Sequence, residues 1–300
     1  MTLRLGGLLA PVTTPFDAAG ELAPTALARN IAAHLAAGVD GIVVTGSTGE
    51  AALLDESERL EVMESARSAT PSDRLLVAGV GAESTRTTVR LARAAAERGV
   101  DAVLVVAPHY YGAAMMSAAA LLAHYRRVAD ESPVPVVLYN IPKYMHFRLA
   151  PQLVAELSAH GNVVGIKDSS GDVELLSVYL NYQHDHFAVL TGSAQLLQTA
   201  LESSARGGVL AVSTFAAPVA RAVMEAVARG DRADATEAQA RLTPLAATIV
   251  GELGVPGIKA ALDLVGLAGG APRMPLQRLG QEQRRTVAEL LRGAELPLVA

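Results

Sequence analysis

A single lysine, Lys167, occupies the position where a buried strand is expected to end. The residues before it, 163–166, are apolar or glycine, and residues 168–172 are polar or glycine. An apolar run of this length is typical of a strand buried on both faces. Burial disfavours the ammonium form of a lysine, so the neutral amine can attack a carbonyl carbon. The position indicates a lysine that forms an imine, and a strand-end lysine that reaches solvent is the plainer alternative.

A tyrosine ends the preceding apolar run in the same way. Tyr139 follows residues 134–138, and its phenol could carry protons to and from a substrate bound to Lys167. Barrels of parallel strands place their active sites at the carboxyl ends of the strands. The residues that follow the expected strands are Thr13 and Thr14, Gly46–Glu50, Pro108–Tyr111, Tyr139 and Asn140, Lys167–Ser169, Gly192 and Ser193, and Ser213 and Thr214.

These candidates include no histidine or carboxylate cluster with metal-site spacing, so we predict no metal. His184 and His186 precede an expected strand, which places them at the far end of a barrel. His34 and His124 are expected at surface or helix positions. We also predict no cofactor. A pyridoxal phosphate enzyme could use a lysine imine as well, but the chain shows no clear phosphate loop for it, since the glycine-rich stretch 206–208 precedes its strand.

Eight short apolar runs alternate with alanine-rich helical stretches, which predicts an α/β fold of the (β/α)8 TIM-barrel type. The expected strands are 8–13, 41–45, 75–79, 102–106, 134–139, 163–167, 187–191 and 208–212. A doubly wound sheet is the competing fold. It usually carries a glycine-rich turn after the first strand, whereas this chain has Thr13–Phe16 there.

Helical patterns cover 25–37, 56–68, 86–98, 118–129 and 216–229, then 232–251, 258–265 and 281–291. Asp55, Ser84 and Ser117 are expected N-caps, and Gly230 is an expected helix end. We predict a catalytic barrel over residues 1–230 and a C-terminal helical extension over 231–300 that packs on it, since no flexible linker separates the two.

The composition excludes several functional classes. A net charge of −5, spread along the chain, argues against nucleic acid, and there is no polybasic membrane patch. The absence of cysteine excludes disulfides and thiolate nucleophiles. With no signal-peptide pattern and no membrane-length apolar run, a cytoplasmic protein is expected.

Taken together, the motifs resemble those of the dihydrodipicolinate synthase / N-acetylneuraminate lyase family of class I pyruvate-dependent aldolases. The resemblance spans nearly the whole chain. It is carried by Pro11–Phe16, Gly46–Glu50, Pro108–Tyr111, Tyr139–Pro142 and Gly165–Asp168, which agree in order, spacing and strand-end placement.

The resemblance implies a role for each residue of the site. Lys167 would form the imine with pyruvate or another 2-oxo acid, and Tyr139 would shuttle protons. Ser47 and Thr48 would bind the carboxylate and link Tyr139 to Tyr110, with Tyr111 as the reserve choice. The resemblance places this further tyrosine in the active site of a neighbouring subunit, which implies a dimer paired into a homotetramer.

Further substrate contacts are implied for Ser169, Leu210 and Tyr144. Tyr144 stands where synthases that make dihydrodipicolinate carry an arginine for the second substrate's carboxylate, and a tyrosine gives no bidentate charged contact. Lys143 is a possible substitute. Sialic acid lyases share the Gly46–Glu50 loop, but their acidic pair is absent after Gly192.

The best overall resemblance is to 4-hydroxy-2-oxoglutarate aldolase, which forms pyruvate and glyoxylate. It is carried by 57–62, 81–85, 167–169, 192–194, 255–259 and 271–273. Thr48 departs from the asparagine expected there. The alternatives are dihydrodipicolinate synthesis, cleavage or dehydration of N-acetylneuraminate or 2-keto-3-deoxy sugar acids, and a non-catalytic 2-oxo acid binding protein.

Overall fold

The computed structural model describes residues 5–299 and contains a closed barrel of eight parallel strands in sequential order. The strands are β1 (Gly7–Pro11), β2 (Gly41–Val44), β3 (Leu75–Gly79), β4 (Ala102–Val106), β5 (Val136–Asn140), β6 (Val163–Asp168), β7 (Ala188–Thr191) and β8 (Gly207–Val209). β8 closes the barrel by pairing with β1. The predicted TIM barrel is confirmed.

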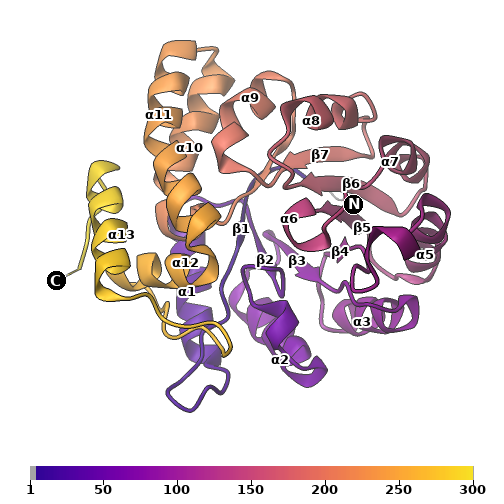
Figure 1. The fold of residues 1–300 in the computed structure, drawn as a ribbon, viewed down its shortest axis with the longest axis horizontal. Helices are drawn as coiled ribbons and strands as arrows, with labels where there is room; N and C mark the ends of the chain where they lie inside the picture. The colour runs from indigo at the N-terminus through magenta and orange to yellow at the C-terminus, as the bar shows by residue number, and fades with distance from the viewer. Residues whose placement is uncertain (1–4, 300) are drawn as a thin grey trace.

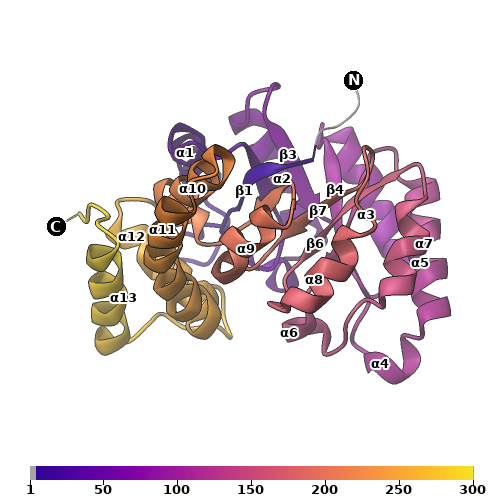
Figure 2. The same ribbon diagram turned by 90° about the horizontal axis from the view of Figure 1, so that it is seen from above.

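Helices surround the barrel, as Figures 1 and 2 show. They are α1 (Pro24–Ala36), α2 (Glu56–Ala69), α3 (Thr85–Glu97), α4 (Gly112–Met115), α5 (Ala118–Glu131), α6 (Pro142–Met145), α7 (Pro151–Ser158), α8 (Val173–Leu180), α9 (Leu197–Glu202) and α10 (Ser213–Arg229), with short 3₁₀ turns at Ala51–Leu53 and Ala194–Leu196. The predicted caps are confirmed: Asp55, Ser84 and Ser117 accept backbone N–H groups, and Gly230 ends α10 in the left-handed conformation.

β3 and β4 match their predicted bounds, and the other six strands differ by one to three residues at an end. For β5 and β8 the reason is identifiable. β5 begins at Val136 because Pro135 has no N–H group to donate to the sheet. β8 ends at Val209 because the chain then turns: the backbone N–H and the hydroxyl of Ser213 both donate to the carbonyl of Leu210. The hydroxyl residues after β8 therefore belong to the start of α10.

The C-terminal extension is a set of helices that packs beside α10 (Figure 1). It comprises α11 (Arg232–Pro244), a π-helix (Leu245–Glu252), α12 (Gly254–Leu264) and α13 (Gln281–Gly293). The single helix predicted over 232–251 is wrong, because the backbone changes to π-helical geometry after Pro244. The predicted boundary at residue 230 stays a prediction, and the outer limits, 1 and 300, lie outside the described residues.

One hydrophobic core runs through the barrel and its helices. The strand residues are almost all buried, and side chains of the extension, such as Leu242, Ile249 and Leu291, belong to the same cluster. Packing of this kind fixes the position of the extension relative to the strand ends. Between residues 5 and 299, every helix is too short or too polar to cross a membrane.

Candidate active site

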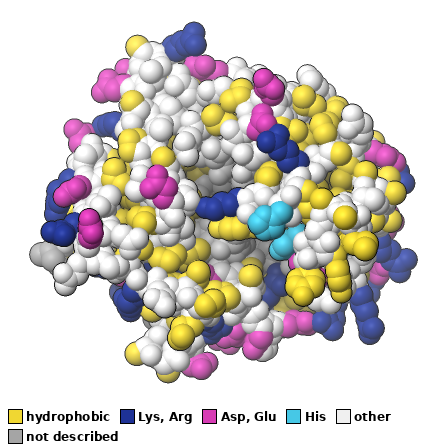
Figure 3. All heavy atoms as spheres, in the orientation of Figure 1, with side chains coloured by type: hydrophobic (Ala, Val, Ile, Leu, Met, Phe, Trp, Pro, Cys, Tyr) yellow, Lys and Arg dark blue, Asp and Glu magenta, His cyan; other side chains and the backbone are white. Residues whose placement is uncertain are grey.

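A cavity of about 310 Å³ opens at the carboxyl ends of the strands. Its wall includes Ser47 and Thr48 after β2, Tyr139 on β5, Lys143 and Tyr144 in α6, Lys167 on β6, Ser169–Gly171, Gly192–Gln195, and, from the extension, Ala246, Val250, Gly251, Gly254, Val255 and Ile258. The face drawn in Figure 3 is hollowed near its centre, between the regions labelled α6 and α12 in Figure 1. The structure thus brings most of the predicted site residues together.

Lys167 and Tyr139 lie side by side on adjacent strands. They are direct partners in the β5–β6 register, and the Lys167 Nζ atom is 4.2 Å from the centroid of the Tyr139 ring. Lys167 is only 6% exposed, and no carboxylate among residues 5–299 forms an ion pair with it. The other buried lysine of this part of the chain, Lys259, is paired with Glu50. Lys167 therefore has the unpaired amine that imine chemistry needs.

The loop that carries Ser47 and Thr48 is held between two residues of left-handed backbone. Thr45 has a φ of 49° and Glu50 a φ of 59°. A β-branched residue seldom adopts such a conformation, which costs about 1–3 kcal/mol. Thr45 is held there by its hydroxyl, which donates to the Gly79 carbonyl, and by the missing side chain of Gly79, since a Cβ would lie 2.2 Å from the Thr45 carbonyl oxygen.

Gly192 provides the space for Lys167 and Ser169 after β7. A Cβ at position 192 would lie 1.9 Å from the Ser169 Oγ atom and 3.0 Å from the Lys167 Cε atom. The sequence singled out Gly192 only by its place at a strand end. Glycine is needed at this position because the side chains of Ser169 and Lys167 approach the backbone too closely for a Cβ atom, and a sequence pattern does not reveal such a contact.

A buried carboxylate joins the ends of β5 and β6. Asp168 accepts hydrogen bonds from the Asn140 side-chain amide and the Ser170 hydroxyl, each at 2.7 Å. Burial raises the pKa of the Asp168 carboxyl, and these hydrogen bonds oppose the rise. Sequence reasoning gave neither residue a function, although both stand at strand ends. Their hydrogen bonds hold the loop beginning at Ser169 against the strand that carries Tyr139.

One side of the cavity is formed by α6 and the extension. Tyr144 lines it and is partly exposed, and burial raises the pKa of its phenol. Lys143 donates to the backbone carbonyl of Gly251 at 2.7 Å. Gly251 belongs to the π-helix, which therefore forms part of the cavity wall. The sequence predicted packing for this segment but no part in the site.

Two predicted residues lie outside this cavity wall. Tyr110 is 79% exposed, beside the exposed Tyr111. Its backbone N–H donates to Glu83, whose carboxylate also contacts His109. Leu210 is fully buried and is not part of the wall, because the turn after β8 directs its neighbours Val209 and Ala211 to the cavity instead.

A second, more apolar cavity of about 620 Å³ adjoins the first and shares Ser47, Tyr139 and Tyr144 with it. Its remaining wall includes residues of β3 and β4, the segment 50–54, the polar side chains of Arg59, Glu83 and His109, and Pro275 and Leu276 of the extension. Within residues 5–299, no group of three or more histidine, aspartate or glutamate side chains is close enough to hold a metal ion.

The chain is similar to known proteins over nearly its whole length. The Dihydrodipicolinate synthetase family matches residues 4–294. The 4-hydroxy-tetrahydrodipicolinate synthase of Desulforudis audaxviator is 33% identical over 297 residues, covering 99% of this chain and 100% of the relative. Dihydrodipicolinate synthase from Bacillus anthracis superposes with a TM-score of 0.92 at 28% identity, over 97% of this chain and 99% of that chain. A prophage protein of the same family from E. coli K12, solved with pyruvate, gives a TM-score of 0.91 at 29% identity over 98% and 100% of the two chains.

Proposed function

Because this chain belongs to the dihydrodipicolinate synthetase family of lysine Schiff-base lyases, we propose that Lys167 is its imine-forming residue. The observation that carries the proposal is the unpaired, buried amine of Lys167, placed against the Tyr139 ring inside the cavity. The pyruvate bound to the structural relative from E. coli K12 supports a 2-oxo acid as the substrate.

The reaction follows from these positions. The Lys167 amine adds to the keto carbon, and loss of water gives a protonated imine. This imine accepts the electron pair when a proton or an aldehyde leaves the neighbouring carbon, which gives an enamine. Tyr139 moves the proton on and off the reacting atoms. The hydroxyls of Ser47 and Thr48 bind the substrate carboxylate, with Ser169 beside the imine.

The first candidate for the second substrate is aspartate semialdehyde, as in 4-hydroxy-tetrahydrodipicolinate synthases. The names of the relatives support it, at 33–35% identity over nearly the full chain. The wall of the cavity carries two lysines, Lys143 and Lys167, and no aspartate or glutamate. That balance of charge suits an aldehyde that itself bears a carboxylate, which is true of aspartate semialdehyde and of glyoxylate alike.

The second candidate is the cleavage of 4-hydroxy-2-oxoglutarate to pyruvate and glyoxylate. It is favoured by Tyr144, which lines the cavity where the resemblance to synthases calls for an arginine. A phenol hydrogen-bonds a carboxylate without the bidentate charge of a guanidinium. The motif resemblance drawn from the sequence also favours this aldolase, whereas the named relatives, such as the one 33% identical over 297 residues, favour the synthase. The two candidates share pyruvate and differ only in the second substrate.

The oligomer belongs to the same proposal. Tyr110, exposed and outside the cavity of its own chain, would complete the site of a neighbouring copy in a dimer or tetramer. Leu210 would act only indirectly, through the adjacent residues of the cavity wall.

Borohydride reduction in the presence of pyruvate tests the imine. The chain has three lysines, Lys143, Lys167 and Lys259, so peptide mass analysis assigns the adduct without ambiguity. We expect it on Lys167, and an unmodified Lys167 would overturn the proposal. Pyruvate release from 4-hydroxy-2-oxoglutarate, sialic acid and 2-keto-3-deoxygluconate, measured beside dihydrodipicolinate formation from pyruvate and aspartate semialdehyde, then separates the candidates.

A further inference from the structure

A cluster of two cations and two carboxylates, one pair buried and the other partly exposed, joins the C-terminal extension to the loop of Ser47 and Thr48. Its centre is an ion pair between Lys259 of α12 and Glu50, with 2.6 Å between the Nζ and Oε1 atoms. Lys259 is 1% exposed and also donates to the carbonyls of Thr14 and Ala271, each at 2.9 Å. The ammonium group thus has two backbone acceptors and one paired carboxylate around it.

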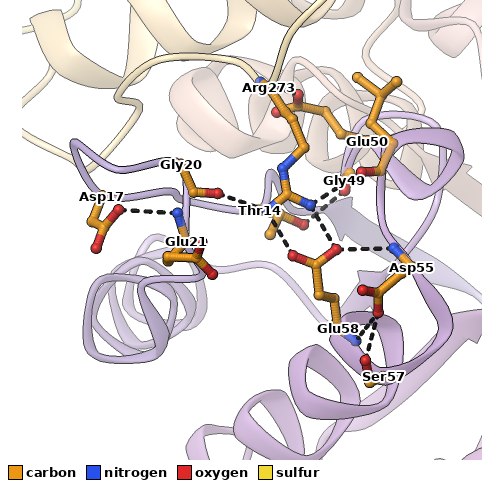
Figure 4. Close-up of polar contacts among 11 residues, drawn as sticks. Thr14, Asp17, Gly20, Glu21, Gly49, Glu50, Asp55, Ser57, Glu58 and Arg273 are labelled. Atoms are coloured by element: carbon orange, nitrogen blue, oxygen red, sulfur yellow. Dashed lines mark hydrogen bonds and ion pairs between the residues drawn. The ribbon is translucent and has the colours of Figure 1, made fainter.

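Arg273 connects the same carboxylate to the start of α2. Its backbone N–H donates to the Glu50 Oε2 atom at 2.8 Å, and its guanidinium forms two parallel contacts of 2.6 Å with Glu58. Glu58 also accepts the backbone N–H of Asp55, the N-cap of α2. Figure 4 shows Arg273 reaching from the extension toward Glu58, with Glu50 and Gly20 beside it. Bidentate pairs of this kind fix geometry as well as charge.

The cluster is attached directly to the proposed carboxylate-binding loop. Glu50 follows Thr48 by two residues, and its backbone N–H donates to the Ser47 carbonyl. The Thr14 hydroxyl donates to the Gly49 carbonyl at 2.7 Å, while the Thr14 carbonyl accepts from Lys259. Left-handed residues at such loop ends persist only where the surrounding structure holds them. The contacts of Glu50 supply that restraint on one side of the loop.

The same turn of α12 lines the active-site cavity. Gly254, Val255 and Ile258 are part of its wall, and Lys259 follows Ile258 directly. Any shift of Lys259 therefore moves a wall of the cavity and its hydroxyl loop together. A buried ion pair contributes little net stability compared with apolar side chains of similar volume. The placement of the Lys259–Glu50 pair therefore indicates that it fixes the position of the loop and the cavity wall.

We propose that Lys259 and Arg273 are positioning residues that hold Ser47 and Thr48 in the geometry that binds the substrate carboxylate. The inference rests on the proposed function, because it takes Ser47 and Thr48 as the carboxylate-binding pair. It predicts an effect on the affinity for 2-oxo acid that exceeds any effect on the chemistry at Lys167.

The test measures the pyruvate concentration at half-maximal borohydride trapping on Lys167. We expect it to rise by about tenfold in Arg273→Lys, which keeps the charge but loses the bidentate contact, and in the double variant Glu50→Gln with Lys259→Met. The amount trapped at saturating pyruvate stays at the wild-type level. Arg67→Gln is the matched control, because it removes an ion pair with Asp101 at the opposite end of α2.

Thermal unfolding of each variant is recorded alongside. Unchanged half-saturation in a folded Arg273→Lys variant would overturn the inference, as would an equal rise in Arg67→Gln. If the double variant does not fold, Arg273→Lys still decides. Absence of trapping in the wild-type enzyme would instead contradict the proposed function, so the two failures are distinguishable.

Discussion

At the scale of single residues, the site depends on a glycine as much as on its functional groups. Gly192→Ala would place a methyl group against Ser169 Oγ and Lys167 Cε. We expect the side chain of Lys167 to shift, with kcat reduced by about 100-fold while the protein stays folded. Steady-state kinetics and thermal unfolding check this. Gly161→Ala is the control, because nothing lies within 4 Å of a Cβ there; equal kinetics in both variants would contradict the argument.

The buried histidine His34 gives a prediction for stability against pH. It lies on α1 at 2% exposure, and burial lowers its pKa to about 4. Below about pH 6.5 the unfolded chain binds the proton more strongly than the folded chain. The free energy of unfolding therefore falls as pH falls from 6.5 toward 4, by up to about 3 kcal/mol for this group. Above pH 6.5 the contribution is constant.

Urea unfolding at pH 5 and pH 7.5 measures that loss. His34→Leu removes the titrating group and should reduce the difference between the two pH values. If His34→Leu keeps the wild-type pH dependence of the free energy of unfolding, another group is responsible for the loss of stability. His124, whose pKa burial also lowers to about 4, is the first alternative.

At the scale of elements, the barrel was predictable and the wall contributed by the extension was not. Apolar runs such as 75–79 and 102–106 predict their strands to the residue, because a strand buried on both faces leaves a local signature. The placement of Lys167 and Tyr139 in one site was predictable as well, because the carboxyl ends of the strands lie on one face of a barrel. The contact between Glu50 and Lys259 joins residues about 200 positions apart, which no local pattern records.

The contact between α6 and the π-helix gives a prediction about the binding of the second substrate. Lys143→Met would remove the ammonium that donates to Gly251 at the cavity wall. We expect kcat/KM for the carboxylate-bearing second substrate to fall by about tenfold, in line with the loss of one charged contact. Pyruvate trapping on Lys167 should be unchanged. A variant that loses both activities equally would show that Lys143 only supports the structure.

At the scale of the whole molecule, the predicted tyrosine Tyr110 does not reach the cavity that holds Lys167 in the same chain. Tyr110 is exposed, and the apolar cavity beside Tyr139 and Ser47 is open. Exposed apolar side chains gathered near such a cavity are typical of an interface. Tyr110, Tyr111 and Met115 form such a group in and before α4.

Subunit mixing decides whether Tyr110 acts on a neighbouring copy. Tyr110→Phe lacks the proposed proton link, and Lys167→Arg lacks the imine, so each variant alone should be nearly inactive. In a mixed dimer, the chain that keeps Lys167 receives an intact Tyr110 from its partner. We expect co-refolded mixtures to regain activity in proportion to the mixed species, about half of the dimers at equal amounts if assembly is random. Activity that stays at the level of the separate variants, in mixtures shown by light scattering to contain dimers, would place Tyr110 outside the neighbour's site.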